Sequence, residues 1–315
     1  MKNLVDIILN KVNYTIVLVV FLLLCNTIVQ AQKEAQYTQY MYNTTSINPA
    51  YAGSRDVFSL FGLYRAQWTG VDGAPATANL AFNTPVNDRI GLGVTIASDK
   101  IGPSEEADFS VDFSYNIPFE NGYRFYFGIK SSANLLNVDF TKLNIYNPGN
   151  PSFTNNVDKQ LSPNIGTGIY LQSDRSYLGV SVPYLLKTEH YKTSSNSVIR
   201  DDLPLYLMGG YVFDLSDDIQ FKPAFLGTFV EDTPVKLDVS VNLLYAQKVM
   251  LGLSYRSNRA LSMLTGFQVS DSFYLGYGYD FETNALSSSY GGTYEFFLRY
   301  EVFRNTNKIV RERFF

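Results

Sequence analysis

Apolar and polar residues alternate one by one along much of this chain. In "DFSVDFSYNI" (108–117), one face carries Phe109, Val111, Phe113, Tyr115 and Ile117, and the other carries Asp108, Ser110, Asp112, Ser114 and Asn116. A repeat of two residues matches a β-strand, whose side chains point alternately to opposite faces, and does not match the 3.6-residue repeat of a helix. The same pattern recurs in "RIGLGVTIAS" (89–98) and "VKLDVSVNLLY" (235–245). These segments predict strands with one apolar and one polar face.

Runs of this kind predict fourteen strands, most of them close to the roughly 9 to 11 residues that cross a bilayer at a tilt. Strand ends read from sequence shift by about two to four residues, which leaves counts of twelve and sixteen open. The expected strands are 56–68, 76–85, 89–98, 107–117, 122–134, 164–172, 176–184, 204–213, 219–229, 235–245, 248–256, 259–269, 272–280 and 292–302.

The connections between these strands alternate in length. Short ones such as "VND", "PFEN" and "SDR" follow the even-numbered strands, whereas "TGVDGAP", "DKIGPSEE" and the segments 135–163 and 185–203 follow odd-numbered ones. Among the connections after odd-numbered strands, only those around Glu231 and Asn258 are brief. Short periplasmic turns and long outer loops are typical of outer-membrane barrels. The pattern therefore favours a transmembrane antiparallel β-barrel in the bacterial outer membrane over a soluble β-sandwich.

Composition agrees with a lipid-facing surface. The chain has 24 Tyr and 23 Phe, and only 17% of its residues are charged. Nucleic acid is excluded as a partner, because its binding depends on clustered Lys and Arg and this chain carries a net charge of −4. Amphipathic rings are expected at the headgroup level near strand ends: Trp68, Tyr115, Tyr123, Tyr184, Tyr211, Tyr255 and Tyr279.

The first residues predict a secretory signal peptide. Lys2 and Lys11 precede the apolar run "TIVLVVFLLLC", and cleavage is expected after Ala31. A lipoprotein signal with Cys25 as the lipid-carrying residue is the alternative, although Leu24 stands where a small residue is needed. Cleavage after Ala31 removes the chain's one cysteine and, with it, any thiol chemistry.

The sequence divides into four expected parts. Residues 1–31 are the signal peptide, 32–55 a plug or a periplasmic docking segment, 56–303 the barrel, and 304–315 a C-terminal tail. In the stretch 32–55, "INPAYAG" interrupts any strand, because Pro49 keeps Asn48 out of the helical region. Either Phe303 or Phe315 is the terminal aromatic residue of the barrel signal.

No catalytic, cofactor-binding or metal-binding residues are expected. His190 is the single histidine and lies in the polar loop "KTEHYKTSSNS", where no supporting triad is evident. The Gly-x-Gly patterns at Gly91, Gly166 and Gly276 fall inside strands and not at strand-to-helix turns, so they indicate small residues on inner faces.

Charged residues of both signs fall on the expected inner faces. Mixed signs favour a plugged lumen over a selective pore, which tends to use one sign. The set comprises Asp108, Asp112, Arg124, Lys130, Lys222, Lys236, Asp238, Arg256, Glu295 and Arg299.

Three blocks resemble the PorP/SprF family of type IX secretion outer-membrane proteins of Bacteroidetes. They are "QYMYNTTSINPAYAGSRD", "LYRAQWTGVDGAPATANLAFNTPV" and "RIGLGVTIASDKIGP", and "GGTYEFFLRY" is similar to the last strand of the family. Asn83 departs from the histidine that is common at this position. The matching positions, interpreted as structural or docking residues, are Asn48, Pro49, Ala50, Tyr51, Ala52, Gly53, Tyr64, Arg65, Gln67, Trp68, Gly70, Asp72, Gly73, Ala74 and Pro75.

The resemblance implies a non-enzymatic accessory component for protein export or surface attachment, in gliding bacteria of adhesins. Its implied partners are outer-membrane lipid, the translocon or periplasmic lipoprotein ring of the secretion machinery, and a secreted protein with a C-terminal sorting domain. A solute channel of the fatty-acid-transporter type is the alternative. An outer-membrane hydrolase dependent on His190 is a third hypothesis, for which no activity is expected.

Overall fold

The computed structural model describes residues 40–142, 156–186, 203–231, 233–257, 260–283 and 291–302. Residues 35–231 and 235–315 form one compact unit, which contains every strand. Met1–Glu34 and Asp232–Pro234 form the other unit. The expected signal peptide (1–31), the expected tail (304–315), His190, Phe303 and Phe315 lie outside the described residues.

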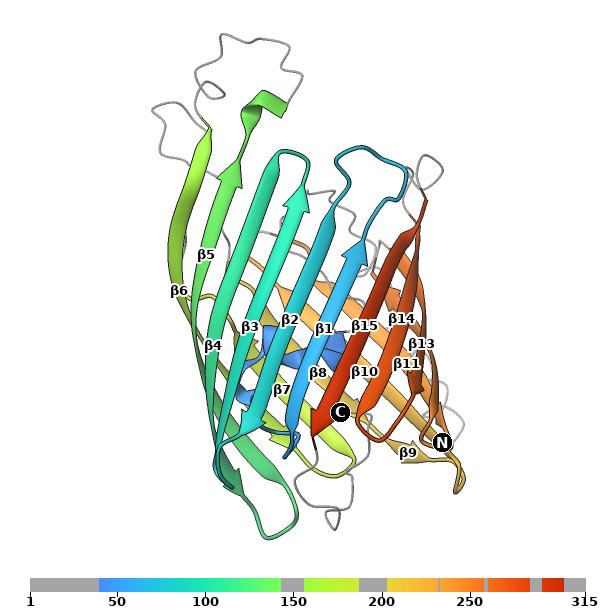
Figure 1. Ribbon diagram of the computed structural model, residues 1–315. Helices are drawn as coiled ribbons and strands as arrows, with labels where there is room; N and C mark the ends of the chain where they lie inside the picture. Colours follow the sequence, from blue (N-terminus) through green and yellow to red (C-terminus); the bar gives the residue numbers. More distant parts are fainter. Residues whose placement is uncertain are drawn as a thin grey trace, which may run out of the picture. The chain divides into compact units, whose positions relative to one another are not determined.

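The strands form one antiparallel sheet that closes on itself (Figure 1). Each strand pairs with its neighbours in the sequence, and the ring closes where β1 pairs with β15, from Phe58 opposite Val302 to Ala66 opposite Tyr294. The strands are β1 (Phe58–Ala66), β2 (Ala76–Pro85), β3 (Ile90–Ile101), β4 (Ser104–Pro118), β5 (Arg124–Val138), β6 (Val157–Gln172), β7 (Ser176–Val182), β8 (Leu205–Tyr211), β9 (Phe213–Asp214), β10 (Ile219–Phe229), β11 (Lys236–Tyr245), β12 (Val249–Arg256), β13 (Ala260–Gln268), β14 (Phe273–Glu282) and β15 (Thr293–Val302).

Two of these strands act as one. β8 and β9 both pair with β10 and are separated by the single residue Val212, whose N–H donates to the carbonyl of Arg175. With β8 and β9 counted as one, the barrel has fourteen strands, so the predicted fold class and strand number are confirmed.

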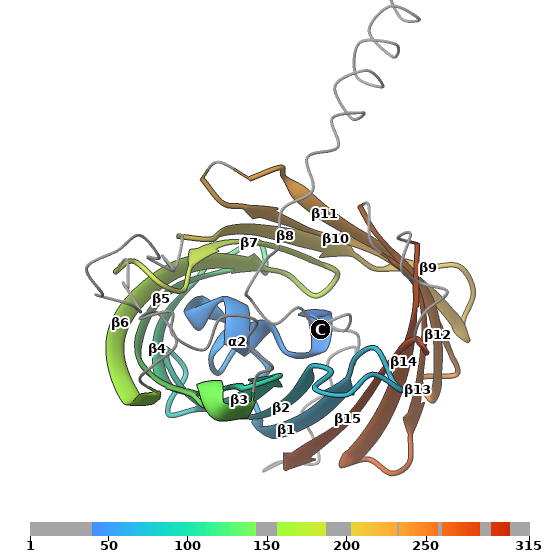
Figure 2. The ribbon, with the colours of Figure 1, turned by 90° about the horizontal axis from the view of Figure 1, so that it is seen from above.

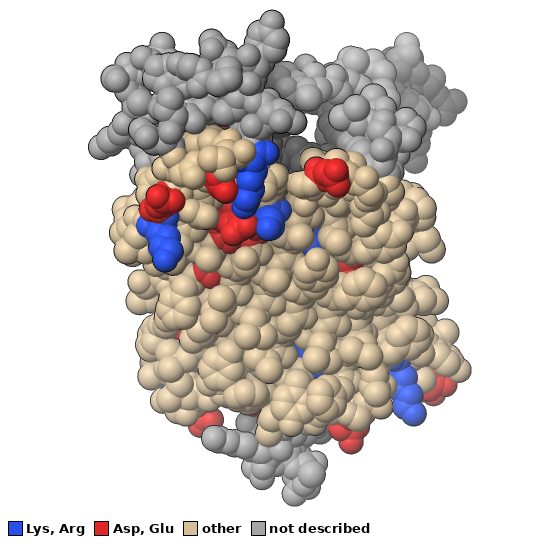
Figure 3. Space-filling model, turned by 45° about the horizontal axis from the view of Figure 1, so that its top comes forward, with Lys and Arg blue, Asp and Glu red and all other residues tan. Residues whose placement is uncertain are grey.

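The alternation of the sequence separates the two faces of the wall. On β4, Phe109, Val111 and Phe113 are 49, 41 and 39% exposed, while Ser110 and Asp112 between them are buried. On the face seen in Figure 3, charged side chains gather near the two ends and leave an uncharged band between them. Such a band is what a lipid-facing barrel surface needs.

The predicted loop "DKIGPSEE" is wrong. β3 and β4 remain paired as far as Ile101 and Ser104, and Gly102–Pro103 alone makes the turn. β5 and β6 likewise continue to Val138 and from Val157. Beyond the bilayer both faces of a hairpin meet water, so the hydrophobic alternation ends while the strand pairing continues.

The two ends of the barrel differ. Six short turns lie at one end together with the start of β1 and the end of β15. The other end carries the long connections 67–75, 139–156, 183–204 and 283–292 together with two short ones, 102–103 and 257–259. By the rule for outer-membrane barrels, the short-turn end faces the periplasm and the long-loop end faces outward.

The helical elements are short. They are η1 (Tyr40–Tyr42), α2 (Thr44–Ile47), η2 (Pro49–Tyr51) and η3 (Phe140–Lys142). Within the described residues, no helix is long and apolar enough to cross a membrane.

Candidate functional site

The lumen contains the chain that precedes β1. We call Tyr40–Asp56 the inner segment; viewed from above, α2 lies within the ring of strands (Figure 2). Residues 40–54 are buried except for Ser46, which is half-buried. η2 contacts β4, β5 and β6, and α2 contacts β2 and β3.

Asn48 gives the inner segment its bend. Its backbone is extended (ψ 111°), its side-chain Oδ1 accepts from the N–H of Ala50 at 3.0 Å, and Pro49 follows at the first position of η2. This is an N-cap with proline at N1, a combination that fixes where a helical turn begins. The Nδ2 of Asn48 donates to the Ile169 carbonyl on β6 at 3.0 Å, so the same side chain also attaches the bend to the barrel wall.

Glycines in the wall receive this bend. A Cβ added at Gly128 on β5 would lie 2.1 Å from the Ala50 nitrogen, and one at Gly91 on β3 would lie 2.2 Å from the Ala52 oxygen. At Gly168 on β6 it would lie 2.2 Å from Oδ1 of Asn48. No side chain fits at these points, because the two backbones are in direct contact at Gly91 and Gly128, and the Asn48 side chain occupies the space at Gly168. Gly91 and Gly168 belong to the Gly-x-Gly patterns, and their inner-face location agrees with the prediction.

Large side chains fill the opposite half of the lumen. Tyr42 stacks on Phe297 and Tyr274 with ring centroids 4.9 and 5.5 Å apart, and its hydroxyl lies 3.2 Å from that of Tyr274. Arg299 and Lys222 each lie 5.6 Å from the centroid of the Tyr42 ring, within the range of a cation–π contact. We call the inward side chains at this place the lumen floor: Leu244, Met250, Leu264, Tyr274 and Phe297, all buried in one cluster with Tyr40, Met41 and Tyr42.

Hydrogen bonds attach the inner segment to strands around the ring. Asn43 donates to Asn79 on β2 at 3.0 Å, and Ser181 on β7 donates to the Ile47 carbonyl at 3.0 Å. Ser114 on β4 donates to the carbonyl of Ala52 at 2.6 Å. These bonds satisfy backbone and amide groups that burial would otherwise leave unpaired.

Ion pairs fix the C-terminal end of the inner segment at the short-turn end. Arg55 pairs with Glu301 on β15, and Asp56 pairs with Arg124 on β5 at 2.7 Å. Burial lowers the pKa of the Arg55 guanidinium, but the Glu301 carboxylate and Tyr51 raise it above its ordinary value, so Arg55 stays charged.

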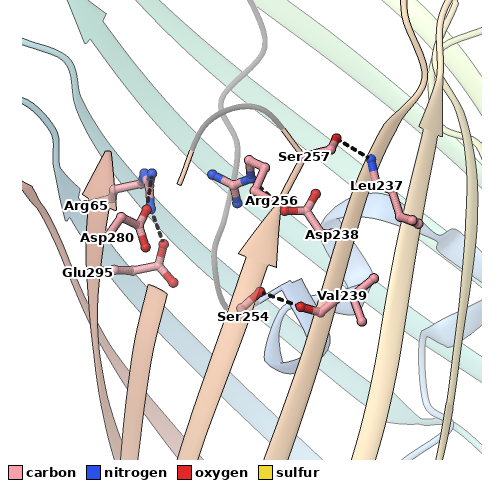
Figure 4. Close-up of polar contacts among 9 residues, drawn as sticks. All are labelled: Arg65, Leu237, Asp238, Val239, Ser254, Arg256, Ser257, Asp280 and Glu295. Atoms are coloured by element: carbon pink, nitrogen blue, oxygen red, sulfur yellow. Dashed lines mark hydrogen bonds and ion pairs between the residues drawn. The ribbon is translucent and has the colours of Figure 1, made fainter. Parts of the chain in front are cut away.

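A second group of ion pairs lies near the long-loop end (Figure 4). Arg65 on β1 donates to Asp280 on β14 at 2.8 Å and to Glu295 on β15 at 3.0 Å. Arg256 on β12 donates to Asp238 on β11 at 2.6 Å. All of these side chains are at least nine-tenths buried.

The ten predicted inner-face charges take up their expected side. Asp112, Lys130, Lys222, Asp238, Arg256, Glu295 and Arg299 are buried, and Asp108, Arg124 and Lys236 are half-buried. Lys130 and Asp112, directly opposite each other on β5 and β4, pair at 3.2 Å.

Sequence reasoning missed Arg65 and Asp280 as lumen residues. On β1, the inward residues include Phe61 and Leu63 and the outward ones include Leu60, so both faces are apolar. The position of Arg65 in the alternation therefore does not indicate which face it is on. On β14, by contrast, the apolar outward residues Phe273 and Leu275 alternate with inward ones, and the same parity places Asp280 inside.

The signature positions do not form a single site. The inner segment contains Asn48, Pro49, Ala50, Tyr51, Ala52 and Gly53. Arg65 binds the carboxylates of Asp280 and Glu295 where β1 and β15 close the barrel, and Tyr64 faces outward. Gln67 to Pro75 form the loop after β1, which the bond from the Gln67 N–H to the Pro75 carbonyl closes at 2.9 Å.

This loop is braced by its neighbours. Gly73, at φ +73°, accepts through its carbonyl from the Gly102 N–H at 2.9 Å, and Thr69 accepts from the Gly291 N–H at 2.9 Å. Nε1 of Trp68 donates to Glu282 at 3.3 Å. The loop therefore has a defined shape at the long-loop end.

Among the expected girdle residues, Trp68, Tyr115, Tyr211 and Tyr255 are exposed, and the remaining three are half-buried. Over the described part of the chain, no group of three or more His, Cys, Asp or Glu residues is placed to hold a metal ion.

Fold and lumen together define an outer-membrane β-barrel whose lumen contains its own N-terminal region. The profile of the family described as type IX secretion system membrane protein PorP/SprF matches residues 29–300, and the chain belongs to this family. It is thus an outer-membrane component of the type IX secretion system, as the sequence blocks indicated. No match is found among curated proteins.

Solved structures with a similar fold are distant in sequence. A TodX deltaS2S3 mutant, a monoaromatic hydrocarbon channel, is 10% identical with a TM-score of 0.50, over 82% of this chain and 94% of that one. The CymD monoaromatic hydrocarbon channel is 12% identical (TM-score 0.49, 84% and 93% covered). A Pseudomonas aeruginosa FadL homologue is also 12% identical (TM-score 0.47, 83% and 93%). At such identities the likeness concerns the fold alone.

Proposed function

We propose that this barrel supports the export or surface attachment of secreted proteins, of the gliding-adhesin type, by binding other proteins. The partners in this proposal are a secreted protein with a C-terminal sorting domain and the translocon or lipoprotein ring of the secretion machinery. Family membership supports the general role. The proposal concerns the mode of action: the barrel binds, and neither conducts nor catalyses.

The occupied lumen is the observation that carries the proposal. The inner segment fills the β3–β7 side against Gly91, Gly128 and Gly168, and the lumen floor fills the other side. A solute channel of the fatty-acid-transporter type needs a continuous path. We therefore take residues 32–55 to be a plug, which the packing of 40–54 supports, ahead of a barrel over 56–303 and a tail over 304–315.

Within this proposal the signature positions divide by place. Those inside the lumen, from Asn48 to Gly53 together with Arg65, are structural. Those in the braced loop, Gln67, Trp68, Gly70, Asp72, Gly73, Ala74 and Pro75, are docking residues. A loop with fixed shape loses little conformational entropy on binding, which favours its use as a contact surface.

Gene deletion tests the role. We expect loss of adhesin-type proteins from the cell surface and loss of gliding, both restored by the wild-type gene. Unchanged display and motility in the deletion strain would contradict the proposal.

A matched pair of variants tests the docking surface. Val71 in the braced loop and Val86 in a short turn are exposed valines (42 and 54%) at opposite ends of the barrel. Complementation with Val71→Asp is expected to reduce surface display, and complementation with Val86→Asp is expected to restore it. Equal display with both variants, at equal barrel abundance, would exclude the loop as the docking surface.

A further inference from the structure

Aromatic residues cover the outward face of the last two strands at every depth. Of the five outward positions on each strand, four on β14 and three on β15 are Phe or Tyr. On β11, by contrast, the outward residues are Leu or Val as far as Tyr245 at the strand end. Aromatic residues of outer-membrane barrels normally form girdles at the two interfaces, and they are enriched where proteins bind one another. The aromatic residues at mid-depth on this side therefore indicate a contact with protein.

This side of the wall also carries a groove. It has a volume of about 540 Å³ and runs across the outward faces of β13, β14 and β15 to β1. Gly62 lies at its β1 end, where the missing side chain leaves a gap between Leu298 on β15 and Leu80 on β2. The strands β15, β1 and β2 lie side by side at the front of Figure 1, and the same face carries the uncharged band of Figure 3. The gap at Gly62 is therefore open to an apolar side chain from outside the barrel.

Large and small outward residues form two rows across β15, β1, β2 and β3, which we call the β1–β2 patch. The upper row, nearer the long-loop end, consists of Phe296, Tyr64, Ala78 and Ser98. The lower row consists of Leu298, Gly62, Leu80 and Ile96. In the upper row the large residues are on β15 and β1 and the small ones on β2 and β3. In the lower row the small residue is on β1 and its large neighbour is on β2.

We infer that two copies of this chain associate in the outer membrane through the β1–β2 patch, about a two-fold axis that is normal to the membrane and lies between β1 and β2. Such an axis places β1 of one copy against β2 of the second, and β15 against β3. In the upper row, Tyr64 then lies against Ala78 of the second copy. In the lower row, Leu80 enters the gap at Gly62 of the second copy. At the centre of the patch, each large residue therefore meets a small one.

This match of shapes matters more in a membrane than in water. Lipid tails are as apolar as these side chains, so association within a bilayer depends on close packing and not on the hydrophobic effect. A flat aliphatic wall packs equally well against lipid. A wall with a gap beside a protruding leucine packs best against its own two-fold copy.

The area of the patch suits a dimer. Its five large side chains are 41–54% exposed, and they present roughly 500 Å² when a whole side chain is counted as about 200 Å². The exposed Ala78 and Ser98 and the half-buried neighbours Leu60 and Phe82 add to this area, toward the roughly 800 Å² that each partner contributes to a standard interface. The inference uses only the wall of the barrel, so it does not depend on the proposed docking of secreted proteins.

Counting of subunits in lipid tests the inference. The protein, carrying one fluorophore per chain and reconstituted at low density in liposomes, is expected to bleach in two steps. Gly62→Leu fills the gap, and a Cβ added there meets only a methyl group of Leu80 at 3.9 Å, so the barrel itself accepts the change. This variant is expected to lower the dimer association constant by about tenfold or more, because a fitted contact becomes overpacked.

A second variant separates loss of fit from loss of folding. The double variant Gly62→Leu/Leu80→Gly exchanges the large and the small position of the lower row, so the two copies match again. It is expected to restore the association constant to within about threefold of the wild type, as a volume-conserving exchange should. The control is Val241→Leu, on the outward face of β11 and 40% exposed before the change, which should leave the dimer unaffected.

Disulfide formation between two differently tagged copies locates the contact in cells. One copy carries Tyr64→Cys and the other Ala78→Cys, both in a Cys25→Ser background, so no bond can form within a chain. Mild oxidation is expected to give a dimer that carries both tags. The control pair is Leu243→Cys and Leu251→Cys, which are opposite each other on β11 and β12, are 44 and 60% exposed, and should give no such dimer.

Monomeric wild-type protein in liposomes would overturn the inference and would leave the gap at Gly62 to lipid. Dimers that Gly62→Leu leaves intact would also overturn it. So would equal cross-linking at the β11–β12 control positions, because the contact would then not be confined to the β1–β2 patch.

Discussion

Arg65 on β1 donates to Asp280 on β14 at 2.8 Å, across the intervening strand β15 that closes the barrel. The same guanidinium donates to Glu295 on β15 at 3.0 Å. One cation therefore binds two carboxylates across the seam between the first and last strands. The three side chains are almost fully buried, so each depends on the others for the interactions that water would otherwise supply.

Loss of Arg65 is expected to weaken the seam strongly. Arg65→Ala leaves Asp280 and Glu295 facing each other in a buried site, and breaking a buried pair in this way costs about 3–5 kcal/mol. The measurement is the free energy of unfolding in detergent micelles or bilayers. The control is Lys100→Ala, which breaks the exposed pair with Glu105 (58 and 45% exposed) and is expected to cost about 0–1 kcal/mol. Equal costs for the two variants would contradict the importance of the seam cluster.

A methyl group at Gly128 is expected to displace the inner segment. The added Cβ would lie 2.1 Å from the Ala50 nitrogen, too close for two non-bonded atoms, so one of the two backbones must shift. Planar-bilayer recordings should show ion conductance for Gly128→Ala and closed barrels for the wild type. In the matched control Gly62→Ala, on the outward face of β1, the nearest atom is 3.9 Å away, so this barrel should stay closed. A closed Gly128→Ala barrel would mean that the inner segment does not block the lumen.

Removal of the Asn48 side chain is expected to cost about 1–3 kcal/mol, since it deletes an N-cap and leaves the part-buried Ile169 carbonyl without this donor. Chemical unfolding of Asn48→Ala provides the measurement. Asn87→Ala is the control, because Asn87 also bonds two backbone N–H groups at 2.9 Å, but in an exposed turn. If Asn87→Ala were as destabilising as Asn48→Ala, the attachment of the inner segment would contribute nothing beyond local turn formation.

A charged residue on the outward face of β4 is expected to lower the free energy of unfolding. Phe113→Arg is expected to cost about 2–4 kcal/mol if the residue lies near the bilayer midplane, whereas Phe113→Leu, which stays apolar, should cost less than half as much. Unfolding in lipid bilayers distinguishes the two. Similar values for the two variants would mean that Phe113 does not face hydrocarbon.

Sequence alternation predicted the wall well where one face is polar. β4 is an example, since its serines and aspartates identify the lumen side without ambiguity. Alternation failed on β1, where both faces are apolar and Arg65 could not be assigned. It also ended too early on β3, because the paired strands extend past the bilayer into water, where hydrophobicity no longer distinguishes the faces.

The contacts inside the lumen were beyond prediction from a single sequence. Asp112 and Lys130 were both assigned inward, but their pairing depends on the register between β4 and β5, which no local pattern specifies. The pairing also means that Asp112→Asn, harmless for a residue facing water, leaves a buried lysine without its carboxylate. For the inner segment, Pro49 signalled an interruption, while its place against Gly91, Gly128 and Gly168 depends on contacts between distant parts of the chain.

The close contact between these wall glycines and the inner segment bears on the order of biogenesis. The folded turn of the inner segment touches the barrel wall with no space between them. It cannot slide into a barrel whose strands have already closed by hydrogen bonding. Strands β3 to β7 must therefore assemble around residues 48–52, and the β1–β15 seam must join afterwards. The inner segment thus serves as an internal template for the barrel that closes around it.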